Sequence, residues 1–589
     1  MNIPIVEAQD PADGAAMDAA GGAAVWWTVG LCIFSIGLLL SSLGGPALLE
    51  PDEGRNAEIA REILLLRDWI TPHYDFIPRL DKPILFFDLV ALSYVVFGVS
   101  EWSARLPSAL SAFGCLFLSY CFARRLFGHW AARWSVLILL TSMEFFALSR
   151  IVILDMLLAL FVTAALCCFF IGERWVERGK GRVPFLLMYA ALGLATLSKG
   201  PIGVLLPGAV IGFYLFFSKR WTLLRHMELP LGSALFVLVA APWYMLAEFH
   251  NHGYLHNFFW EQNVARFTTG EFKRAGAWYY FIVVLSVGFL PWTLLLPTTI
   301  ADLFRRGIAR ERLFLILWVA VPLLFFSLSS SKLSHYILPI YPPLAILLGG
   351  VVARMFAEPG RTSRLLSFPA VFFFVLSFGI TLTIVWPGVL PDAVQRYARS
   401  TPAATSVMLS AGSLVAAAVA LIGIRRRLWG RQIFLYPATS VSFLLFILCA
   451  EPIFVTVSAH RSSKLVAAKA SSYIGAEDQL VLYGGYPSSL PFYLNIQQPM
   501  LVVRSGPHSK VLGSDYVVAM RPEPAAGYGR ILFSSEEFAE FWKTSKNRLV
   551  VFVDSGAVNR FMDLVGTRAR LVFELGDTVL LENRTGERR

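Results

Sequence analysis

The sequence of 589 residues is 56% hydrophobic and only 15% charged, whereas about a quarter of the residues in soluble domains are charged. A chain this long and this apolar cannot bury the excess in one globular core, so we expect a lipid bilayer to take it. The net charge of +11 does not indicate a nucleic-acid partner, because the basic residues lie in short clusters between apolar stretches, as topology signals do.

The first apolar stretch runs from Val25 to Gly44 and is long enough to cross a membrane. The residues before it include four acids and no base, which is not the pattern of a cleavable signal peptide. We therefore expect residues 1–24 to be a cytoplasmic tail and the stretch itself to be a retained first helix.

Further apolar runs follow at intervals along the chain, which gives about thirteen expected membrane helices in all. After the first, the expected spans lie near 104–123, 131–149, 154–172, 184–197, 201–218, 229–248, 277–297, 313–329, 336–356, 366–386, 404–424 and 433–455.

The segment 45–103, between the first and the second of these spans, is rich in charge and proline. We expect it to be a periplasmic loop whose helices lie along the membrane surface.

Basic residues load every second loop between these runs, as in Arg124-Arg125 and Arg425-Arg426-Arg427. By the positive-inside rule these loops are cytoplasmic. The other loops and the C-terminal segment then lie in the periplasm, which predicts a multi-pass protein of a bacterial inner membrane with a transmembrane domain over 25–455.

The composition changes after about residue 456, where alternating apolar and polar residues predict strands and amphipathic stretches predict short helices. We expect residues 456–589 to form a small periplasmic α/β domain. Its strands are expected at Gln479–Tyr483, Leu549–Val553 and Thr578–Glu582, and its helices at Ser535–Lys543 and Gly556–Val565.

The most informative cluster is Glu50-Pro-Asp52-Glu53-Gly-Arg55, directly after the first membrane span. Acids suit the positive end of a helix dipole, so an ordinary acidic helix start is one interpretation. The other is chemical: Arg55, one turn after Asp52, can keep a carboxylate ionised at a low-dielectric boundary, where a general base is useful.

Two further motifs carry charge at the expected outer face. Asp81-Lys82-Pro83 opens an apolar helix, and its lysine either snorkels or binds a lipid phosphate; the spacing leaves both open. Asp155 lies at the outer end of a membrane helix, where a carboxylate is costly and usually functional. The alternative is a capping role in which Asp155 pairs with Arg150.

Cations recur at the remaining outer turns. Each one alone is explained by anchoring at the membrane edge, but together they predict a cationic pocket near the interface, suited to an anionic headgroup. The residues are Lys199, Arg266, Lys332, His335 and the neighbouring Tyr336.

Several ordered motifs resemble the lipid-dependent membrane glycosyltransferases of the GT-C type. The chain looks most like the bacterial aminoarabinose transferases and the dolichyl-phosphate-mannose protein mannosyltransferases. The resemblance implies a polytopic α-helical membrane protein of the GT-C type with a C-terminal periplasmic domain. It is carried by residues 51–62, 68–72, 81–83, 97–108, 154–155, 197–201 and 334–339.

The resemblance also implies roles for single residues. Asp52 matches the family's catalytic carboxylate, Asp155 a second acid, and Glu53 is left a supporting residue. The donor phosphate is held by residues that match Arg55, Lys82, Lys199, Arg266 and Tyr336, while Asp81, Lys332 and His335 are weaker candidates.

Departures from the family pattern bear on the cofactor and the sugar. In the aminoarabinose branch a histidine joins the acid of the acid-Lys-Pro motif at a zinc site, and here Asn263 stands at the matching position. No metal ligand is therefore assigned, and a divalent metal stays open. The acid itself is Asp81 rather than Glu, and Asn56 replaces the usual Tyr after the arginine of the first motif.

The expected function is therefore an inverting transfer of a sugar from a polyprenyl-phosphate donor to a lipid, glycan or protein acceptor at the periplasmic face, with membrane lipids as further partners. A transporter or flippase for lipid-linked sugars is the first alternative, although its usual signature is two related halves with charges at the bilayer midplane. A structural protein of the envelope is the second alternative, and it would not need acids and cations gathered on one face.

Overall fold

The computed structural model describes residues 21–260, 276–358, 364–385, 432–504, 524–525, 528–566 and 569–583. The expected span 404–424 and the residues Asn263 and Arg266 lie outside these ranges. The chain forms two compact units: a first unit of residues 1–43 and 105–454, and a second unit of residues 44–104 and 455–589. The division into domains at residue 455 stays a prediction.

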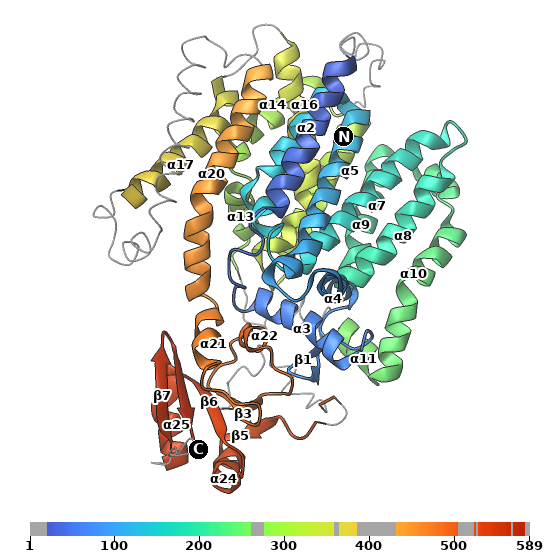
Figure 1. The fold of residues 1–589 in the computed structure, drawn as a ribbon. Helices are drawn as coiled ribbons and strands as arrows, with labels where there is room; N and C mark the ends of the chain where they lie inside the picture. Colours follow the sequence, from blue (N-terminus) through green and yellow to red (C-terminus); the bar gives the residue numbers. More distant parts are fainter. Residues whose placement is uncertain are drawn as a thin grey trace. The chain divides into compact units, whose positions relative to one another are not determined.

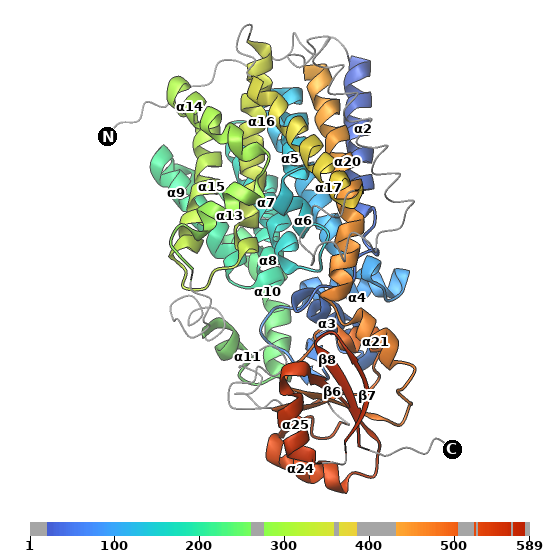
Figure 2. The same ribbon diagram turned by 90° about the vertical axis from the view of Figure 1, so that its left-hand side faces the viewer.

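The first unit is a bundle of helices (Figures 1 and 2). Among the described residues, six helices are long and apolar enough to cross a membrane, or seven if one bent pair is a single span. The chain is a multi-pass membrane protein, and the expected number of about thirteen spans stays a prediction. The helices are α2 (Gly21–Leu40), α5 (Glu101–Leu140), α6 (Met143–Leu148), α7 (Leu154–Val176), α8 (Arg182–Lys199), α9 (Ile202–Ser218), α10 (Leu229–His250), α11 (Tyr254–His256), α13 (Tyr280–Gly288), α14 (Leu296–Arg306), α15 (Arg310–Leu328), α16 (Tyr341–Ala357), α17 (Phe368–Val385) and α20 (Gln432–His460).

Two expected spans are broken in the structure. The expected helix 131–149 is instead the end of α5, which is kinked at Gly128, followed by a break at Thr141-Ser142 and the short α6. The hydroxyls of Thr141 and Ser142 donate to helix carbonyls four residues back, which competes with continued helix pairing. The expected span 277–297 is a bent pair of helices: α13 and the residues from Trp292 onward are bent by 104°, at a break that contains Pro291.

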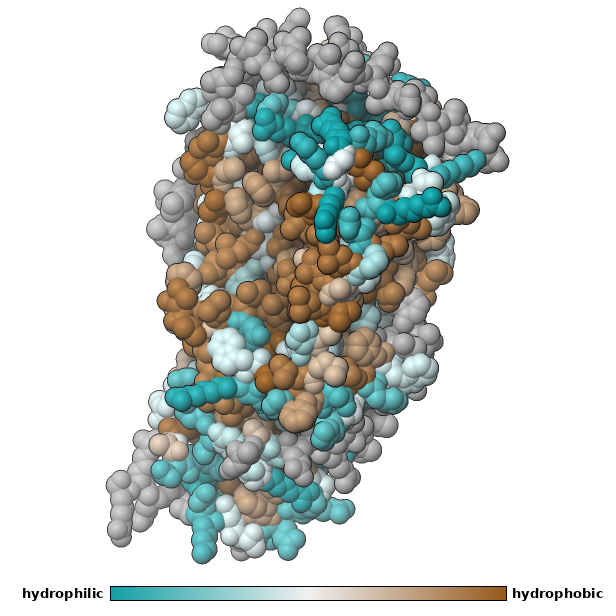
Figure 3. All heavy atoms as spheres, turned by 90° about the vertical axis from the view of Figure 1, so that its right-hand side faces the viewer, coloured by the Kyte–Doolittle hydropathy of each residue, from teal (hydrophilic) through white to brown (hydrophobic). Residues whose placement is uncertain are grey.

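The core of the first unit lies where α5, α7, α9 and α15 meet. Phe122, Phe170, Tyr214, Phe314 and Trp318 are all buried there, and several of their rings pack edge to face. The outer surface of the helix bundle is apolar too, as a bilayer requires. On α8, α9 and α10, large apolar residues are exposed, including Leu187, Phe213 and Leu238. Figure 3 shows brown, hydrophobic side chains gathered over the side of the molecule where these helices lie.

The second unit contains a six-stranded sheet of order β5-β4-β3-β6-β8-β7. The first four strands are parallel, and β8 and β7 are antiparallel additions at one edge. The strands and helices predicted from the C-terminal sequence are confirmed. The elements are β3 (Gln479–Tyr483), β4 (Leu501–Arg504), β5 (Leu532–Ser534), α24 (Ser535–Thr544), β6 (Leu549–Asp554), α25 (Val558–Val565), β7 (Arg570–Leu575) and β8 (Thr578–Glu582).

Helices α24 and α25 cover one face of this sheet. Phe538 and Trp542 of α24 and Phe561 of α25 are buried against alternate strand residues such as Val481 and Val551. The intervening strand residues, which point to the opposite face, are buried as well. Burial on both faces explains why the strands read as continuous apolar runs.

The rest of the second unit comes from both ends of the chain. The early segment contributes α3 (Asp52–Leu66), the two-stranded β1 (His73–Tyr74) and β2 (Ile77–Pro78), and α4 (Leu85–Phe97); the late segment contributes α21 (Lys464–Ala470) and α22 (Leu490–Leu494). On α4, Phe86, Val90 and Tyr94 are buried, while Val96 and Phe97 are among several exposed apolar side chains. An exposed apolar side is what the expected membrane-surface helix needs.

Candidate functional site

The acidic pair lies in the first turn of α3, where the positive end of the helix dipole favours carboxylates. The side chain of Asp52 is 59% exposed and forms an ion pair with Arg55. Glu53 is buried, and its Oε2 accepts a hydrogen bond from the backbone N–H of Leu49 at 3.0 Å. The two acids therefore have different tasks: Asp52 is open to a ligand, and Glu53 fixes the chain that enters the helix.

A second acid lies near the same arginine. Arg79 Nε lies 3.1 Å from Asp81 Oδ1. Burial alone would raise the pKa of Asp81, but the charges of Arg79, Lys82 and Arg55 outweigh it and hold that pKa well below its usual range. Burial likewise opposes the charge of Arg55, yet Asp52 and Asp81 raise the pKa of its guanidinium. The second unit thus places two predicted phosphate-binding cations, Arg55 and Lys82, close to the ionised carboxylate of Asp81.

In the first unit, Asp155 is the centre of another charged group. It lies in the first turn of α7, is only 4% exposed, and forms an ion pair with Lys199 in the last turn of α8. Nε2 of His335 lies 3.8 Å from Asp155 Oδ2, and the Lys199 ammonium lies 4.5 Å from the ring centroid of Tyr336. A cation over an aromatic face is stabilised by the ring quadrupole. Four predicted site residues therefore meet here, from α7, α8 and the 3-10 helix η4 (Ser334–Ile340), which carries His335 and Tyr336.

The alternative interpretation of Asp155, a capping residue paired with Arg150, is wrong in its pairing. Arg150 forms its ion pair with Glu451 instead, at 3.1 Å. The weaker candidate Lys332 donates to the carbonyl oxygen of Gly276 at 3.1 Å. The structure therefore separates Asp155, which is held among predicted site residues, from Arg150, whose partner lies on α20.

Residues 81–246 match the family model described as dolichyl-phosphate-mannose-protein mannosyltransferase. The chain is 31% identical over 343 residues to an undecaprenyl phosphate-alpha-4-amino-4-deoxy-L-arabinose arabinosyl transferase of Edwardsiella ictaluri, with 58% of this chain and 61% of that protein covered. A protein of the same name from Pseudomonas fluorescens is 33% identical over 355 residues, with 59% and 63% covered.

Solved structures extend the likeness to nearly the whole chain. ArnT from Cupriavidus metallidurans in the apo state has a TM-score of 0.78 and 27% identity, over 96% of this chain and 99% of that one. The same protein bound to undecaprenyl phosphate matches with a TM-score of 0.78 and 26% identity, over 95% and 98%. The chain has the GT-C fold and resembles the aminoarabinose transferases. It spans 61% and 63% of the length of the two curated relatives that it matches.

This GT-C-type chain does not fit the zinc site of the family branch that it resembles. The acid that would be a ligand is Asp81, which already lies among the charges of Arg79, Lys82 and Arg55. A divalent cation placed there would meet three positive charges and one carboxylate. Within the described ranges, no three His, Cys, Asp or Glu side chains gather into a set that could hold a metal ion.

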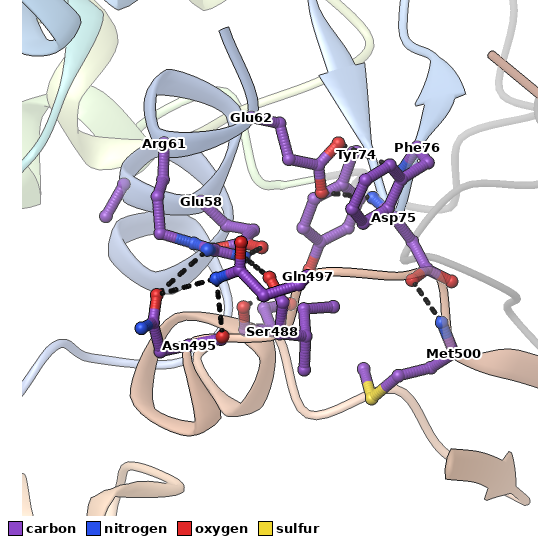
Figure 4. Close-up of polar contacts among 12 residues, drawn as sticks. Glu58, Arg61, Glu62, Tyr74, Asp75, Phe76, Ser488, Asn495, Gln497 and Met500 are labelled. Carbon is purple, nitrogen blue, oxygen red and sulfur yellow. Dashed lines mark hydrogen bonds and ion pairs between the residues drawn. The ribbon is translucent and has the colours of Figure 1, made fainter. Parts of the chain in front are cut away.

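Sequence reasoning missed a network of buried charges in the second unit (Figure 4). On α3, Arg61 makes two hydrogen bonds to Glu58, at 2.8 and 2.7 Å. Glu62 accepts the backbone N–H groups of Asp75 and Phe76, at 2.7 and 2.9 Å. The i, i+3 spacing of Glu58 and Arg61 was a usable signal for the first pair, because such residues are neighbours on a helix. The contact between Glu62 and the residue 75–76 turn left no pattern in the sequence.

A second missed pair lies in the first unit. The hydroxyl of Tyr341, at the start of α16, donates to Glu144 on α6. Gly288 at the end of α13 is packed against both: a Cβ there would lie 2.3 Å from the tyrosine oxygen and 2.4 Å from Glu144 Oε2. Glycine at position 288 thus leaves room for the pair, since a larger residue there would force Glu144 or Tyr341 to shift.

Proposed function

We propose that the protein is an inverting glycosyltransferase that moves a sugar from a polyprenyl phosphate to a lipid, glycan or protein acceptor at the periplasmic face of the bacterial inner membrane. The supporting observation is an exposed carboxylate, Asp52, beside a cation at the start of α3, in a chain similar over 95% of its length to a structure bound to undecaprenyl phosphate. The curated relatives act as arabinosyl transferases by name, so a pentose is the first donor sugar to test.

In the proposed reaction an acceptor oxygen attacks C1 of the sugar while the bond from C1 to the phosphate oxygen breaks. Asp52 orients the acceptor and takes its proton, which a carboxylate beside Arg55 at the positive end of the helix dipole is suited to do. The polyprenyl phosphate leaves with the bonding electrons. A single in-line attack without an enzyme nucleophile inverts the configuration at C1.

The leaving phosphate gains charge as the bond breaks, and cations that meet it lower the barrier. The proposal gives this role to Arg55, Lys82, Lys199 and Arg266, with Tyr336 beside Lys199. Asp155 holds the Lys199 ammonium in place and either positions the substrate or offsets positive charge at the anomeric carbon.

The experiment is a substitution of the proposed base in the full chain. Asp52→Asn keeps the size of the side chain and a hydrogen-bond acceptor but cannot take a proton, so transfer is expected to fall by at least about 10²-fold. Binding of undecaprenyl phosphate and the amount of folded protein are expected to stay unchanged. Glu540→Gln, an exposed acid on α24, is the matched control and is expected to behave like the wild type.

Mass spectrometry of envelope lipids and glycans, from a deletion strain complemented with each variant, reads the acceptor and the sugar together. A flippase would carry lipid-linked sugar across a vesicle membrane without making a glycosylated product. Near wild-type transfer by Asp52→Asn would refute the assignment of the base, and translocation without any product would refute the enzyme.

A further inference from the structure

Glu50, two residues before Asp52, is held by four donors from a distant part of the chain. The backbone N–H of Ser488 donates to Glu50 Oε2 at 2.6 Å, and the backbone N–H of Ser489 donates to Oε1 at 2.8 Å. The hydroxyls of Ser489 and Ser463 also donate to Oε1, at 2.5 and 3.1 Å. Hydrogen bonds to an ionised acceptor are about twice as strong as neutral ones, so this carboxylate is a firm anchor.

The first turn of α3 packs directly against Ser489, one of the residues that bind Glu50. A Cβ built at Gly54 would lie 2.5 Å from the backbone nitrogen of Ser489 and 2.7 Å from its Cα. Backbone atoms cannot give way as the tip of a side chain does. Glycine at this position therefore lets the start of the helix rest against residue 489.

The later turns of α3 are fastened to the same segment of the chain (Figure 4). Arg61 donates to Asn495 Oδ1 at 3.1 Å and to the carbonyl oxygen of Ile496 at 2.8 Å. Asp75, whose backbone N–H is bound by Glu62, accepts the N–H of Met500 at 2.9 Å. The helix that bears Asp52 is thus tied to residues 488–500 near both of its ends.

The side chain of Asp52 is exposed, and its ion-pair partner Arg55 lies on the same helix, three residues further along. The position of its carboxylate depends on the backbone of the turn before it. That turn is fixed by Glu53, which binds the N–H of Leu49, and by the four donors on Glu50.

We propose that Glu50 is a positioning residue for the transfer reaction: by binding Ser488 and Ser489 it sets the turn that presents Asp52. This proposal rests on the proposed function. It gives residues 455–500 a part in catalysis, since they bind the turn before α3 and the later part of that helix. A misplacement of a reacting group by about 1 Å can cost about 10²-fold in rate.

Glu50→Gln tests the proposal, because the amide keeps the shape but turns a donor toward one of the two backbone N–H groups. We expect kcat to fall about 10²-fold, with the KM for the donor and the binding of undecaprenyl phosphate within about twofold of wild type. The pH dependence of the remaining kcat is expected to keep its shape, because Asp52 still takes the proton. Loss of the acidic limb would mean that Glu50 is itself the base and would overturn the proposal.

The matched control is Glu582→Gln. Glu582 on β8 is also a buried acid of the second unit, and it accepts two hydrogen bonds from Arg548, at 3.0 and 2.5 Å, but it is not part of the turn before Asp52. Its variant is expected to keep wild-type kcat. An equal loss of kcat in both variants, or a fall in Glu50→Gln matched by a fall in folded protein, would reduce Glu50 to a general stabilising contact and refute the proposal.

Hydrogen exchange of the peptide that covers residues 49–56 separates this proposal from the proposed function. Faster exchange in Glu50→Gln than in both the wild type and Glu582→Gln supports the anchor whatever reaction the protein catalyses. Unchanged exchange refutes it. A wild type that transfers no sugar, with exchange altered as expected, would refute the proposed function and leave the anchor of the α3 turn in place.

Discussion

We predict that replacing Asp75 by Asn stabilises the folded protein, and that the gain in stability depends on pH. Its side chain is fully buried, and burial, together with the nearby charge of Glu58, raises its pKa from the ordinary 3.8 to about 8, although the N–H of Met500 opposes this. At neutral pH the folded protein therefore keeps this carboxyl protonated, whereas the unfolded chain releases the proton. The folded state is disfavoured by the difference.

The magnitude follows from the two pKa values. For an acid whose folded pKa is raised, stability is fully present below the unfolded value of 3.8 and is lost as the pH rises through the folded value of about 8. Each pH unit in this window costs about 1.4 kcal/mol. The loss is about 4 kcal/mol at pH 7 and levels off near 6 kcal/mol above pH 8, as an order of magnitude.

Asp75→Asn removes this cost because an amide has no proton to lose. The amide oxygen can replace Oδ1 as the acceptor of the Met500 N–H, and the NH₂ group can replace the protonated Oδ2, which has no hydrogen-bond partner among the described residues. The backbone φ of Asp75 is 55°, a left-handed conformation that asparagine tolerates well. The substitution thus preserves the neutral form of the site.

Thermal unfolding of the purified full chain in detergent, from pH 4 to pH 9, measures the effect. We expect the variant to match the wild type near pH 4 and to gain stability steadily up to pH 8. Asp563→Asn, at an exposed position on α25, is the control and should change stability by no more than about 0.5 kcal/mol at any pH. A variant that is less stable than the wild type by the same amount at pH 5 and pH 8 would refute the reasoning.

Three further outcomes are expected. Gly54→Ala places a Cβ 2.5 Å from the backbone of Ser489 and should lower stability by about 1–3 kcal/mol, whereas Gly208→Ala, with no atom within 4 Å of its Cβ, should not; equal unfolding midpoints would contradict this. Lys199→Met should raise the Kd for undecaprenyl phosphate at least about tenfold, checked by titration, because it removes a cation proposed to bind the phosphate and unpairs Asp155. Alkaline phosphatase fused after residue 583 should be active in intact cells; an inactive but stably expressed fusion would place the C-terminal segment in the cytoplasm.

Local patterns in the sequence were enough for three of the six strands of the sheet and for the helices α24 and α25, whereas β4, β5 and β7 were not predicted. The strands β3, β6 and β8 begin at the predicted residues, because apolar alternation is a property of a few neighbouring positions. The two expected spans that are broken in the structure each contain a local feature at the break: the hydroxyl-bearing residues Thr141 and Ser142 in one, and Pro291 in the other. Both breaks lie inside long apolar runs, where hydropathy averaged over a window hides them.

The candidate site was only partly predictable for the same reason. Charge at the outer ends of helices pointed to Asp155, Lys199 and His335, and the structure brings them together. Their pairing, which excludes Arg150, needed the packing of α7 against α8. The contact of Glu50 with Ser488 joins residues 438 positions apart, and no periodicity or motif reaches across such a distance.

A motif rich in acidic residues need not place all of them in an active site, as the acids of α3 show. Glu53 caps the chain before the helix, Glu58 is paired with Arg61, and Glu62 binds two backbone N–H groups; all three are buried with their oxygens engaged. Burying a carboxylate costs several kcal/mol unless such partners are present, so these acids act in the fold. Asp52 differs from them because its carboxylate, which forms an ion pair with Arg55, is open to solvent. Chemistry at this motif is therefore expected at Asp52, and the three buried acids keep the helix that carries it in place.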